Sequence, residues 1–330
     1  MADRIELAFR RAADTALPPE TSGLVAVSGG GDSIALLHLL FRAARRRRWR
    51  LRVAHLDHGM RRGSTADLCF VREQAARLGL ECIHDRRVVG ELRRRDESPE
   101  EAARRVRRAF LLEAAAGAGA TWIATGHSLD DQAETILMRL ARGGGATALT
   151  GMSAVGPGPF VRPLLGLQRA ELRNWLRRHD LRYREDPTNR ELRFDRNRIR
   201  RLVMPVLAET FNPQAAANLV RAAARFRADA SFLDQWAAGR LEALSGTDRH
   251  GQLTLDARAL QDEPGPVARR VIVAALRRAG CDPRRLGARH VEALVDLAAG
   301  AAGRETHLPG RLVARRDRVR IRIGPRTDPT

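Results

Sequence analysis

The chain has 330 residues, enough for two domains with cores of their own, and its 59 basic and 39 acidic residues give a formal net charge of +20. All of the basic residues are arginines, because the sequence contains no lysine. A surplus of basic residues of this size favours a polyanionic partner, most simply a nucleic acid. The three cysteines are too scattered for a disulfide framework or a cysteine-based metal centre, so neither zinc nor an iron–sulfur cluster is expected.

No segment of the sequence predicts an interaction with a membrane. The N-terminus lacks the apolar core of a signal peptide, and no run approaches the roughly 18 apolar residues of a membrane span. Isolated cysteines also suit a reducing compartment, so the sequence predicts a cytoplasmic protein.

The first predicted strand and helix flank a glycine-rich turn. Residues 24–27 are a short apolar run typical of a strand buried on both faces, and an apolar helical pattern begins at Ile34. The turn between them holds three successive glycines, which let the backbone approach a ligand and direct the N–H groups of a helix start at one point. This order predicts a phosphate-binding site.

Two common phosphate motifs are excluded for this turn. A Walker A loop needs a lysine, and the third glycine of the dinucleotide fingerprint would fall at Ile34. The turn instead resembles the SGGxDS loop of the PP-loop ATP pyrophosphatases, which hold the pyrophosphate of ATP; an ordinary glycine turn in a βαβ unit is the competing interpretation. The residues of this loop are Ser28, Gly29, Gly30, Gly31, Asp32 and Ser33.

A polar cluster follows the second predicted strand, residues 51–56. In a parallel sheet the carboxyl ends of the strands line the ligand crevice, so this cluster is expected beside the glycine-rich turn. His55, Asp57 and His58 could be read as metal ligands. Three ligands within four residues at a strand end cannot all point one way, however, so a zinc site is not expected.

A helix rich in arginine is predicted after Ser98. The segment begins with a capping serine, a proline at the first helical position and Glu101 three residues after the cap. Helical spacing places Arg104 with Arg108 and leaves the neighbouring arginines on other faces, so some of them must point toward solvent or a ligand. A helix from Ser64 to about residue 78 and a short strand at residues 80–83 are predicted before it.

The next predicted strand, residues 121–124, is again followed by polar residues. Capping of the following helix explains one acid, but not Asp130, Asp131 and Glu134 with His127 in front of them. Carboxylates near an ATP site can hold Mg²⁺ or bind an ammonium group. Arg142 ends this helix before a run of glycines, where it could meet phosphate or belong to a simple glycine cap.

The remaining chain predicts a second domain, with the boundary at residue 205. Helices are expected over residues 214–243, 264–279 and 287–299, and a hairpin over 312–314 and 318–323. In the second strand of the hairpin, Val319, Ile321 and Ile323 alternate with three arginines, which predicts a core face and an arginine stripe that is either solvated or in contact with RNA. The predicted fold is therefore α/β: a parallel-sheet PP-loop domain over 1–205, and a mainly helical, RNA-binding domain over 206–330 that ends in a small β hairpin.

Seven segments in order resemble those of the tRNA(Ile)-lysidine synthase family, over roughly residues 20–205. They are SGGGDS at 28–33, HLDHGMR at 55–61, EAARRVRR at 101–108, TGHSLDDQAET at 125–135, ARGGG at 141–145, RPLL at 162–165, and DPTN at 186–189 followed by RNRIR at 196–200. Longer members of the family carry a further C-terminal module, and this chain is expected to end before it.

The resemblance implies a ligase that uses ATP to adenylate the C2 carbonyl oxygen of the wobble cytidine in a CAU-anticodon isoleucine tRNA. Free lysine then attacks C2 and releases AMP, which leaves lysidine and changes the codon that is read from AUG to AUA. ATP with Mg²⁺, free lysine and the tRNA are the implied ligands and partners. The sequence leaves the oligomeric state open, and a homodimer is compatible with it.

The resemblance also implies roles for individual residues. The amides of residues 28–33 hold the pyrophosphate, and Asp32 assists through the Mg²⁺ that arrives with ATP. The candidates for binding lysine or Mg²⁺ and for managing the amine proton are Asp32, His127, Asp130, Asp131 and Glu134. The candidates for phosphates of ATP or the anticodon loop are Arg104, Arg108, Arg142, Arg196 and Arg200. Asn197 either reads a base or orients its loop.

Three other functions fit parts of the pattern. A PP-loop enzyme that thiolates tRNA shares the loop and the basic surface, but that chemistry uses cysteines, often paired, and the three here are isolated. A synthetase for GMP, NAD or asparagine acts on a small molecule and does not need this surplus of charge. A non-catalytic RNA-binding protein has no use for the phosphate loop and its acids, and an aromatic content of 4% disfavours binding by base stacking.

Overall fold

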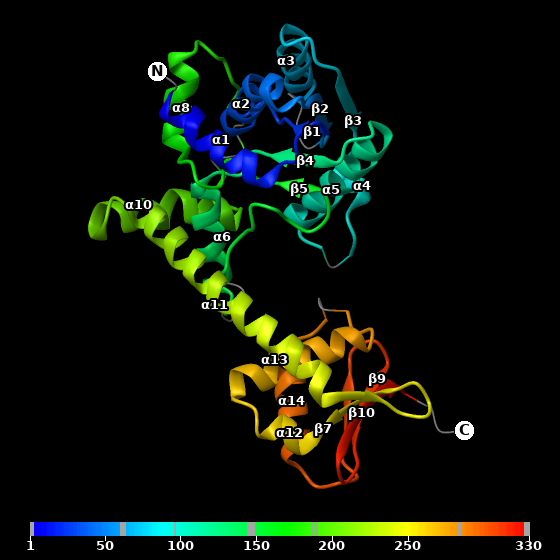
Figure 1. The fold of residues 1–330 in the computed structure, drawn as a ribbon. Coiled ribbons are helices and arrows are strands. Elements are labelled where there is room, and N and C mark those ends of the chain that lie inside the picture. Colours follow the sequence, from blue (N-terminus) through cyan, green and yellow to red (C-terminus); the bar gives the residue numbers. More distant parts are fainter. Residues whose placement is uncertain are drawn as a thin grey trace. The chain divides into compact units, whose positions relative to one another are not determined.

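The computed structural model describes residues 3–59, 64–95, 97–143, 149–185, 188, 191–282 and 285–326. It divides into two compact units, Met1–Arg225 and Phe226–Thr330, which we call the N-terminal and C-terminal units (Figure 1). The long helix α11 (Ala215–Leu244) contains residues of both units. The sequence predicts a boundary earlier in the chain, at residue 205, and the functional assignment of the two parts stays a prediction.

The N-terminal unit is built on a five-stranded parallel sheet with the strand order β3-β2-β1-β4-β5. The strands are β1 (Ser22–Ala26), β2 (Arg50–Asp57), β3 (Cys82–Arg86), β4 (Trp122–Thr125) and β5 (Phe160–Val161). The predicted strand at residues 24–27 is confirmed as β1, which begins two residues earlier and ends one residue earlier. Successive side chains of β1 are buried on opposite faces: Leu24 packs in one cluster and Val25 in another. A parallel strand covered on both faces needs such a continuous apolar run.

Helices cover both faces of this sheet (Figure 1). One face carries α1 (Arg4–Ala16), α2 (Gly31–Arg47), α3 (Ser64–Arg77) and α8 (Arg169–Arg178), and the other carries α5 (Pro99–Gly117). The capping box predicted for α5 is present, since the N–H of Ser98 donates to Glu101 Oε2 at 3.0 Å and the N–H of Glu101 donates to Ser98 Oγ at 3.3 Å. The sequence analysis did not predict α1, α8 or β5.

The remaining helical segments of the N-terminal unit lie after β3 and around the carboxyl edge of the sheet. They are α4 (Val89–Leu92), α6 (Leu129–Ala141), α9 (Asp195–Arg198), η2 (Ile199–Val203), α10 (Met204–Val206) and η3 (Leu207–Phe211). The stretch from α9 to η3 alternates between α-helical and π-helical turns. Its contacts with α6 bring residues near 200 to the helix that follows β4.

The C-terminal unit packs helices on a five-stranded antiparallel sheet with the order β6-β7-β10-β9-β8. Its strands are β6 (Ser245–Thr247), β7 (Leu253–Asp256), β8 (Glu305–Leu308), β9 (Leu312–Arg316) and β10 (Arg320–Pro325), and its further helices are α12 (Ala257–Gln261), α13 (Gly265–Arg278) and α14 (Ala288–Ala299). The predicted hairpin is confirmed as β9–β10. The sequence analysis missed β6, β7 and β8, which extend the hairpin into a sheet.

One residue of the predicted hairpin core is placed differently. Ile321 and Ile323 are buried and Arg320 and Arg322 are exposed, as the alternation predicts. Val319, however, is 58% exposed. Its N–H donates to Asp317 Oδ1 at 2.9 Å, so it belongs to the turn before β10 and has left the strand alternation.

No helix within the described ranges is long and apolar enough to cross a membrane.

Candidate functional site

The glycine-rich turn joins the carboxyl end of β1 to the first turn of α2. Gly30 is the N-cap of α2, and Gly29 has φ = 90°, a conformation that side chains disfavour. Ser33 Oγ donates to the carbonyl of Gly30 at 2.8 Å and accepts from the N–H of Ser28 at 3.2 Å, which closes the loop. The first-turn amides of Gly31, Asp32 and Ser33 have no intrahelical acceptor, so they are available to an anion.

This loop lies at the topological switch point of the sheet. The chain goes from β1 to β2 and β3 on one side, then crosses to β4 on the other side of β1. Ligands of open parallel sheets bind outside the carboxyl ends of the strands at such a point. The polar segment after β4 therefore borders the loop, and a Cβ atom on Gly126 would lie only 3.1 Å from backbone atoms of Asp32 and Ser33.

Gly126→Ala is expected to weaken the binding of ATP, the ligand that the sequence predicts for this loop, about tenfold, because the added methyl group would push the backbone of the loop out of position. Gly117→Ala is the control, since a Cβ atom there meets nothing within 4 Å. Calorimetric titration of both variants with ATP measures the effect. Equal ATP affinities would show that the loop absorbs the contact without changing its geometry.

The acids after β4 meet the loop through an arginine that the sequence analysis did not select. Arg169, the first residue of α8, donates from Nε to Asp32 Oδ2 at 3.1 Å and from Nη2 to Asp131 Oδ1 at 2.7 Å. Its Nη1 lies 3.5 Å from Glu134 Oε1, and its backbone N–H donates to Asp130 Oδ2 at 2.7 Å. All four predicted acids therefore lie around one residue.

Two further arginines bind the same acids from the α9–η2 stretch. Arg196 donates from Nε to Glu134 Oε2 at 2.8 Å, and its Nη2 lies 3.0 Å from Asp131 Oδ1. Arg200 donates from Nε to Glu134 Oε1 at 2.7 Å and from Nη2 to Asp131 Oδ1 at 3.2 Å. The two were predicted to bind phosphate; in this structure they neutralise carboxylates.

Burial and neighbouring charges set the protonation states of the site. Burial raises the pKa of Asp131, but Arg196 and Arg169 outweigh it and lower that pKa to about 2. Burial lowers the pKa of His127 to about 3, against the opposing effect of Asp131, so the imidazole is neutral. For Asp32, burial raises the pKa above its ordinary value, although Arg169 opposes the shift. A neutral His127 with so low a pKa is a poor acceptor for an amine proton.

Asn197 and Arg142 lie at the periphery of the site. The Asn197 side chain is buried, and its Nδ2 donates at 2.9 Å to the carbonyls of both Thr188 and Glu191. This geometry supports the loop-orienting alternative over base reading. Arg142 ends α6 and forms an exposed ion pair with Asp195 at 3.0 Å.

A second group of arginines includes two, Arg107 and Arg162, whose charges act on His127. We call Arg104, Arg107, Arg108 and Arg162 the arginine cluster. None of the four forms an ion pair with a carboxylate in the part of the chain that the structure describes; Arg108 donates to the carbonyl of Pro157 at 3.0 Å and lies over the Phe160 ring. Arg104, Arg107 and Arg108 are exposed, and the charge of Arg104 repels those of Arg107 and Arg108. Mutually repelling cations of this kind are stabilised by an anion.

The polar cluster after β2 is held by hydrogen bonds to the backbone. His55 is buried, and its Nδ1 donates to the carbonyl of Val27 at 2.8 Å, while Asp57 accepts from the N–H of Gly59 at 2.8 Å. No group of three His, Cys, Asp or Glu residues that could hold a metal ion occurs among the described residues. Residues 60–61, 144–145, 186–187 and 189, which belong to the predicted motifs, lie outside the described residues.

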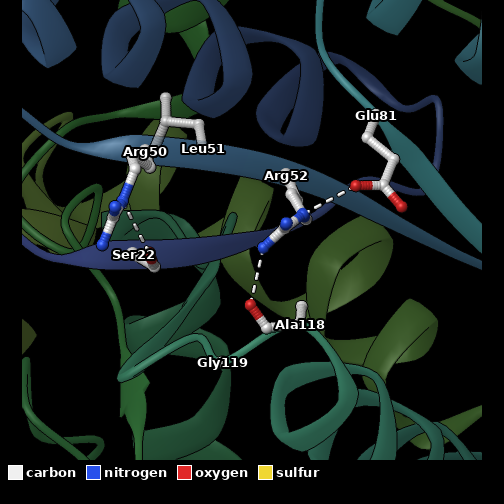
Figure 2. A pocket seen from close by; sticks show the side chains of 7 residues that line it. All are labelled: Ser22, Arg50, Leu51, Arg52, Glu81, Ala118 and Gly119. Atoms are coloured by element: carbon white, nitrogen blue, oxygen red, sulfur yellow. Dashed lines mark hydrogen bonds and ion pairs between the residues drawn. The ribbon is translucent and has the colours of Figure 1, made fainter.

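A cavity of about 530 Å³ lies away from this site, at the amino ends of the strands (Figure 2). Arg52 donates there to Glu81 Oε2 at 2.7 Å and to the carbonyl of Ala118 at 2.6 Å, and Arg50 donates to Ser22 Oγ at 3.2 Å. Both arginines that line the cavity therefore donate hydrogen bonds to neighbouring groups of the protein. We assign no function to this cavity.

Comparison with known proteins identifies relatives over most of the chain. Residues 4–207 match the model of the PP-loop domain family. The tRNA(Ile)-lysidine synthase of Solibacter usitatus is 38% identical over 304 residues, which are 91% of this chain and 66% of that protein. The enzyme of Thermus thermophilus is 40% identical over 301 residues (91% and 56%), and that of Salinispora tropica is 37% identical over 312 residues (92% of each). The chain thus spans about two thirds or less of the Solibacter and Thermus proteins.

Among solved structures, the U34-tRNA thiolase NcsA from Methanococcus maripaludis superposes with a TM-score of 0.57 at 18% identity, over 67% of this chain and 78% of that one. At this identity the similarity shows a shared fold alone.

Proposed function

Since this chain belongs to the tRNA(Ile)-lysidine synthase family of PP-loop proteins, we propose that it joins lysine to C2 of the wobble cytidine in CAU-anticodon tRNA(Ile), with ATP as the energy source. The observation that carries the proposal is the meeting of the phosphate loop and the acids of α6 at the switch point of the sheet, through Arg169. The phosphate loop suits a nucleotide, and we call it the nucleotide half of the site. The acids of α6 suit an amine.

The proposed reaction has two steps. The O2 atom of the cytidine attacks the α-phosphorus of ATP, and diphosphate leaves. The lysine amine then attacks C2, the C2–O2 bond breaks, AMP leaves with that oxygen, and the amine loses a proton. A pyrimidine carbonyl is a poor electrophile, so adenylation supplies the leaving group that the second step needs.

The phosphate loop is proposed to bind the pyrophosphate of ATP through the amides of residues 28–33. Asp32 fits a role toward Mg²⁺, because one of its oxygens is held by Arg169 and the other accepts no hydrogen bond from the described residues. When bound with ATP, Mg²⁺ would offset negative charge on the phosphates. Asp32 is thus proposed to belong to the nucleotide half of the site.

Asp131 and Glu134 are proposed to bind the lysine amine. Both are buried carboxylates on the face of α6 that borders the loop, and Asp130 supports them by accepting the backbone N–H of Arg169. The low pKa of His127 favours a positioning role for it, and its Nδ1 lies 2.9 Å from Thr125 Oγ1.

The arginine cluster is proposed to bind phosphates of the anticodon loop. Arg107→Ala is expected to weaken tRNA binding three- to tenfold and to reduce the slope of log Kd against log salt by about 0.7 to 1, as the loss of one phosphate contact requires. Filter binding across a salt series measures both quantities. Arg105→Ala is the control from the same helix, because Arg105 pairs with Glu97 at 2.7 Å. An unchanged salt slope in Arg107→Ala would remove this residue from the interface.

The C-terminal unit is proposed to contribute to tRNA binding. Its β10 strand exposes Arg320 and Arg322, the preceding turn exposes Arg318, and α11 exposes Phe232 and Trp236, whose ring centroids lie 6.1 Å apart. Arginines contact RNA phosphates, and exposed aromatic rings stack on unpaired bases.

We place the reaction in the cytoplasm. The mass of the free protein in solution tests for a homodimer.

Transfer of labelled lysine to an unmodified CAU-anticodon tRNA(Ile) transcript, with ATP and Mg²⁺, tests the proposed function. A methionine tRNA with the same anticodon is the control. Label on the isoleucine tRNA alone is the expected result. Formation of AMP that requires tRNA but transfers no lysine would retain the PP-loop chemistry and point to a different nucleophile, with sulfur and a thiolation reaction as the first alternative.

A further inference from the structure

Arg169 occupies the centre of the site that is proposed to receive lysine. Its side chain is only 16% exposed, and its three guanidinium nitrogens face Asp32, Asp131 and Glu134. A planar guanidinium presents its N–H groups as a fixed fork, so one side chain can bind carboxylates on two elements at the same time. Arg169 is therefore a physical connection between the phosphate loop and α6.

The amine of lysine needs the acceptors that Arg169 already uses. An ammonium group is a donor of three hydrogen bonds and has no acceptor of its own, so it seeks the same carboxylate oxygens. Glu134 accepts in addition from Arg196 and Arg200, and Asp131 accepts from Arg200 and from the N–H of Ser128. Lysine can gain these oxygens only if one guanidinium gives up its contacts.

Of the three arginines, Arg169 alone also contacts the nucleotide half of the site. Arg196 and Arg200 bind Asp131 and Glu134, whereas Arg169 also binds Asp32 of the phosphate loop. When ATP with Mg²⁺ fills the phosphate loop, Asp32 acquires a new partner, and the phosphate oxygens compete with Asp131 and Glu134 for the guanidinium of Arg169. The ion pairs of Arg169 with Asp131 and Glu134 then weaken, because one planar guanidinium makes all of these contacts from a single position.

We propose that Arg169 is a positioning residue that couples the two halves of the site: it holds Asp131 and Glu134 while the phosphate loop is empty, and it yields them to lysine once a nucleotide engages Asp32. The inference rests on the proposed function, since it takes lysine as the ligand of these acids. The coupling delays lysine binding until the nucleotide is in place. By linkage, lysine must raise the affinity for the nucleotide by the same factor.

The test measures lysine affinity by calorimetry on the full chain, with and without Mg²⁺ and α,β-methylene-ATP, an analogue that cannot be cleaved between its α- and β-phosphates. In the unmodified protein the analogue is expected to tighten lysine binding about tenfold, a coupling of typical size for linked sites. In Arg169→Gln, lysine is expected to bind without the analogue at least as tightly as it binds the unmodified protein with it, and the coupling factor is expected to fall to about 1.

A second variant and a control separate this role from a structural one. Arg169→Lys keeps the charge and the balance with the acids but lacks the fork, so it is expected to remain stable and to lose most of the coupling. Arg173→Gln, one turn further along α8 in an exposed pair with Glu185, is expected to keep the full coupling. Thermal unfolding and binding of the analogue alone verify that each variant is folded.

Four results would overturn the inference. They are an unmodified protein without coupling, a coupling factor that persists in both Arg169 variants, a loss of coupling in Arg173→Gln, and a loss of lysine binding in Arg169→Gln at unchanged affinity for the analogue, which would make Arg169 part of the lysine site. An unmodified protein that binds the analogue but no lysine under either condition would overturn the proposed function together with the inference.

Discussion

Asp32→Ala is expected to abolish transfer of adenylate to tRNA, with a fall in rate of at least about a thousandfold, while tRNA affinity changes less than about twofold. The carboxylate lies in the first turn of α2 beside the amides of the phosphate loop, and it is the acid of this site that we assign to the nucleotide half. Its removal takes away charge at the phosphates. It leaves the arginine cluster intact.

The fold is expected to tolerate this substitution. Arg169 keeps Asp131 and Glu134 as partners, so no guanidinium loses all of its compensation. The substitution also removes a carboxylate whose charged form is disfavoured by burial, as its raised pKa indicates. Release of labelled diphosphate measures the first step, and filter binding measures tRNA affinity. A parallel loss of tRNA affinity would show that Asp32 serves the RNA and not the nucleotide.

Glu134→Gln is expected to lower the free energy of unfolding by about 3 kcal/mol and to eliminate lysine transfer. Glu134 is 1% exposed and accepts hydrogen bonds from Arg196 and Arg200, with Arg169 Nη1 at 3.5 Å. Glutamine keeps the size of the side chain but removes its charge, and its amide nitrogen faces donors. Among the described residues, Arg196 and Arg200 then keep only Asp131 as a carboxylate partner, and breaking ion pairs by removing one buried partner is costly.

Urea unfolding monitored by circular dichroism measures the stability loss, and the lysine-transfer assay measures activity. Asp195→Asn is the matched control, because Asp195 pairs with Arg142 and Arg198 in an exposed position. Exposed pairs contribute about 1 kcal/mol or less, so the control is expected to unfold nearly as the unmodified protein does. Equal stability of Glu134→Gln and the control would mean that Glu134 does not organise the arginines around it.

Much of the site was predictable because its signals are local. The phosphate loop is six adjacent residues between an apolar strand and an apolar helix, and hydrogen bonds among Ser28, Gly30 and Ser33 close the turn locally. The acids of α6 were recognisable because helical spacing places Asp131 and Glu134 on one face. The order of the strands then follows from ordinary parallel-sheet topology, which brings both segments to the same edge.

The arginines of the site were only partly predictable. Arg196 and Arg200 were selected for phosphate, but they bind Asp131 and Glu134, and Arg169 and Arg107 were not selected at all. With 59 arginines in the chain, residue type carries little information about which one pairs with which acid. Arg169 lies four positions after the end of the RPLL segment, and that position indicated no contact with Asp32.

The sequence by itself determined the class of the N-terminal fold, the phosphate loop, the acids beside it and the family, because each of these depends on residue types within a few positions of one another. Only the tertiary structure decided how the charges of the site are paired, that Asn197 donates to the carbonyls of Thr188 and Glu191, and that the terminal hairpin belongs to a five-stranded sheet. Asp32 and Arg169 are 137 positions apart, and their contact exists only because α2 and α8 pack on the same face of the sheet. Long-range contacts of that kind are determined by how whole helices and strands pack, so no local sequence pattern predicts them.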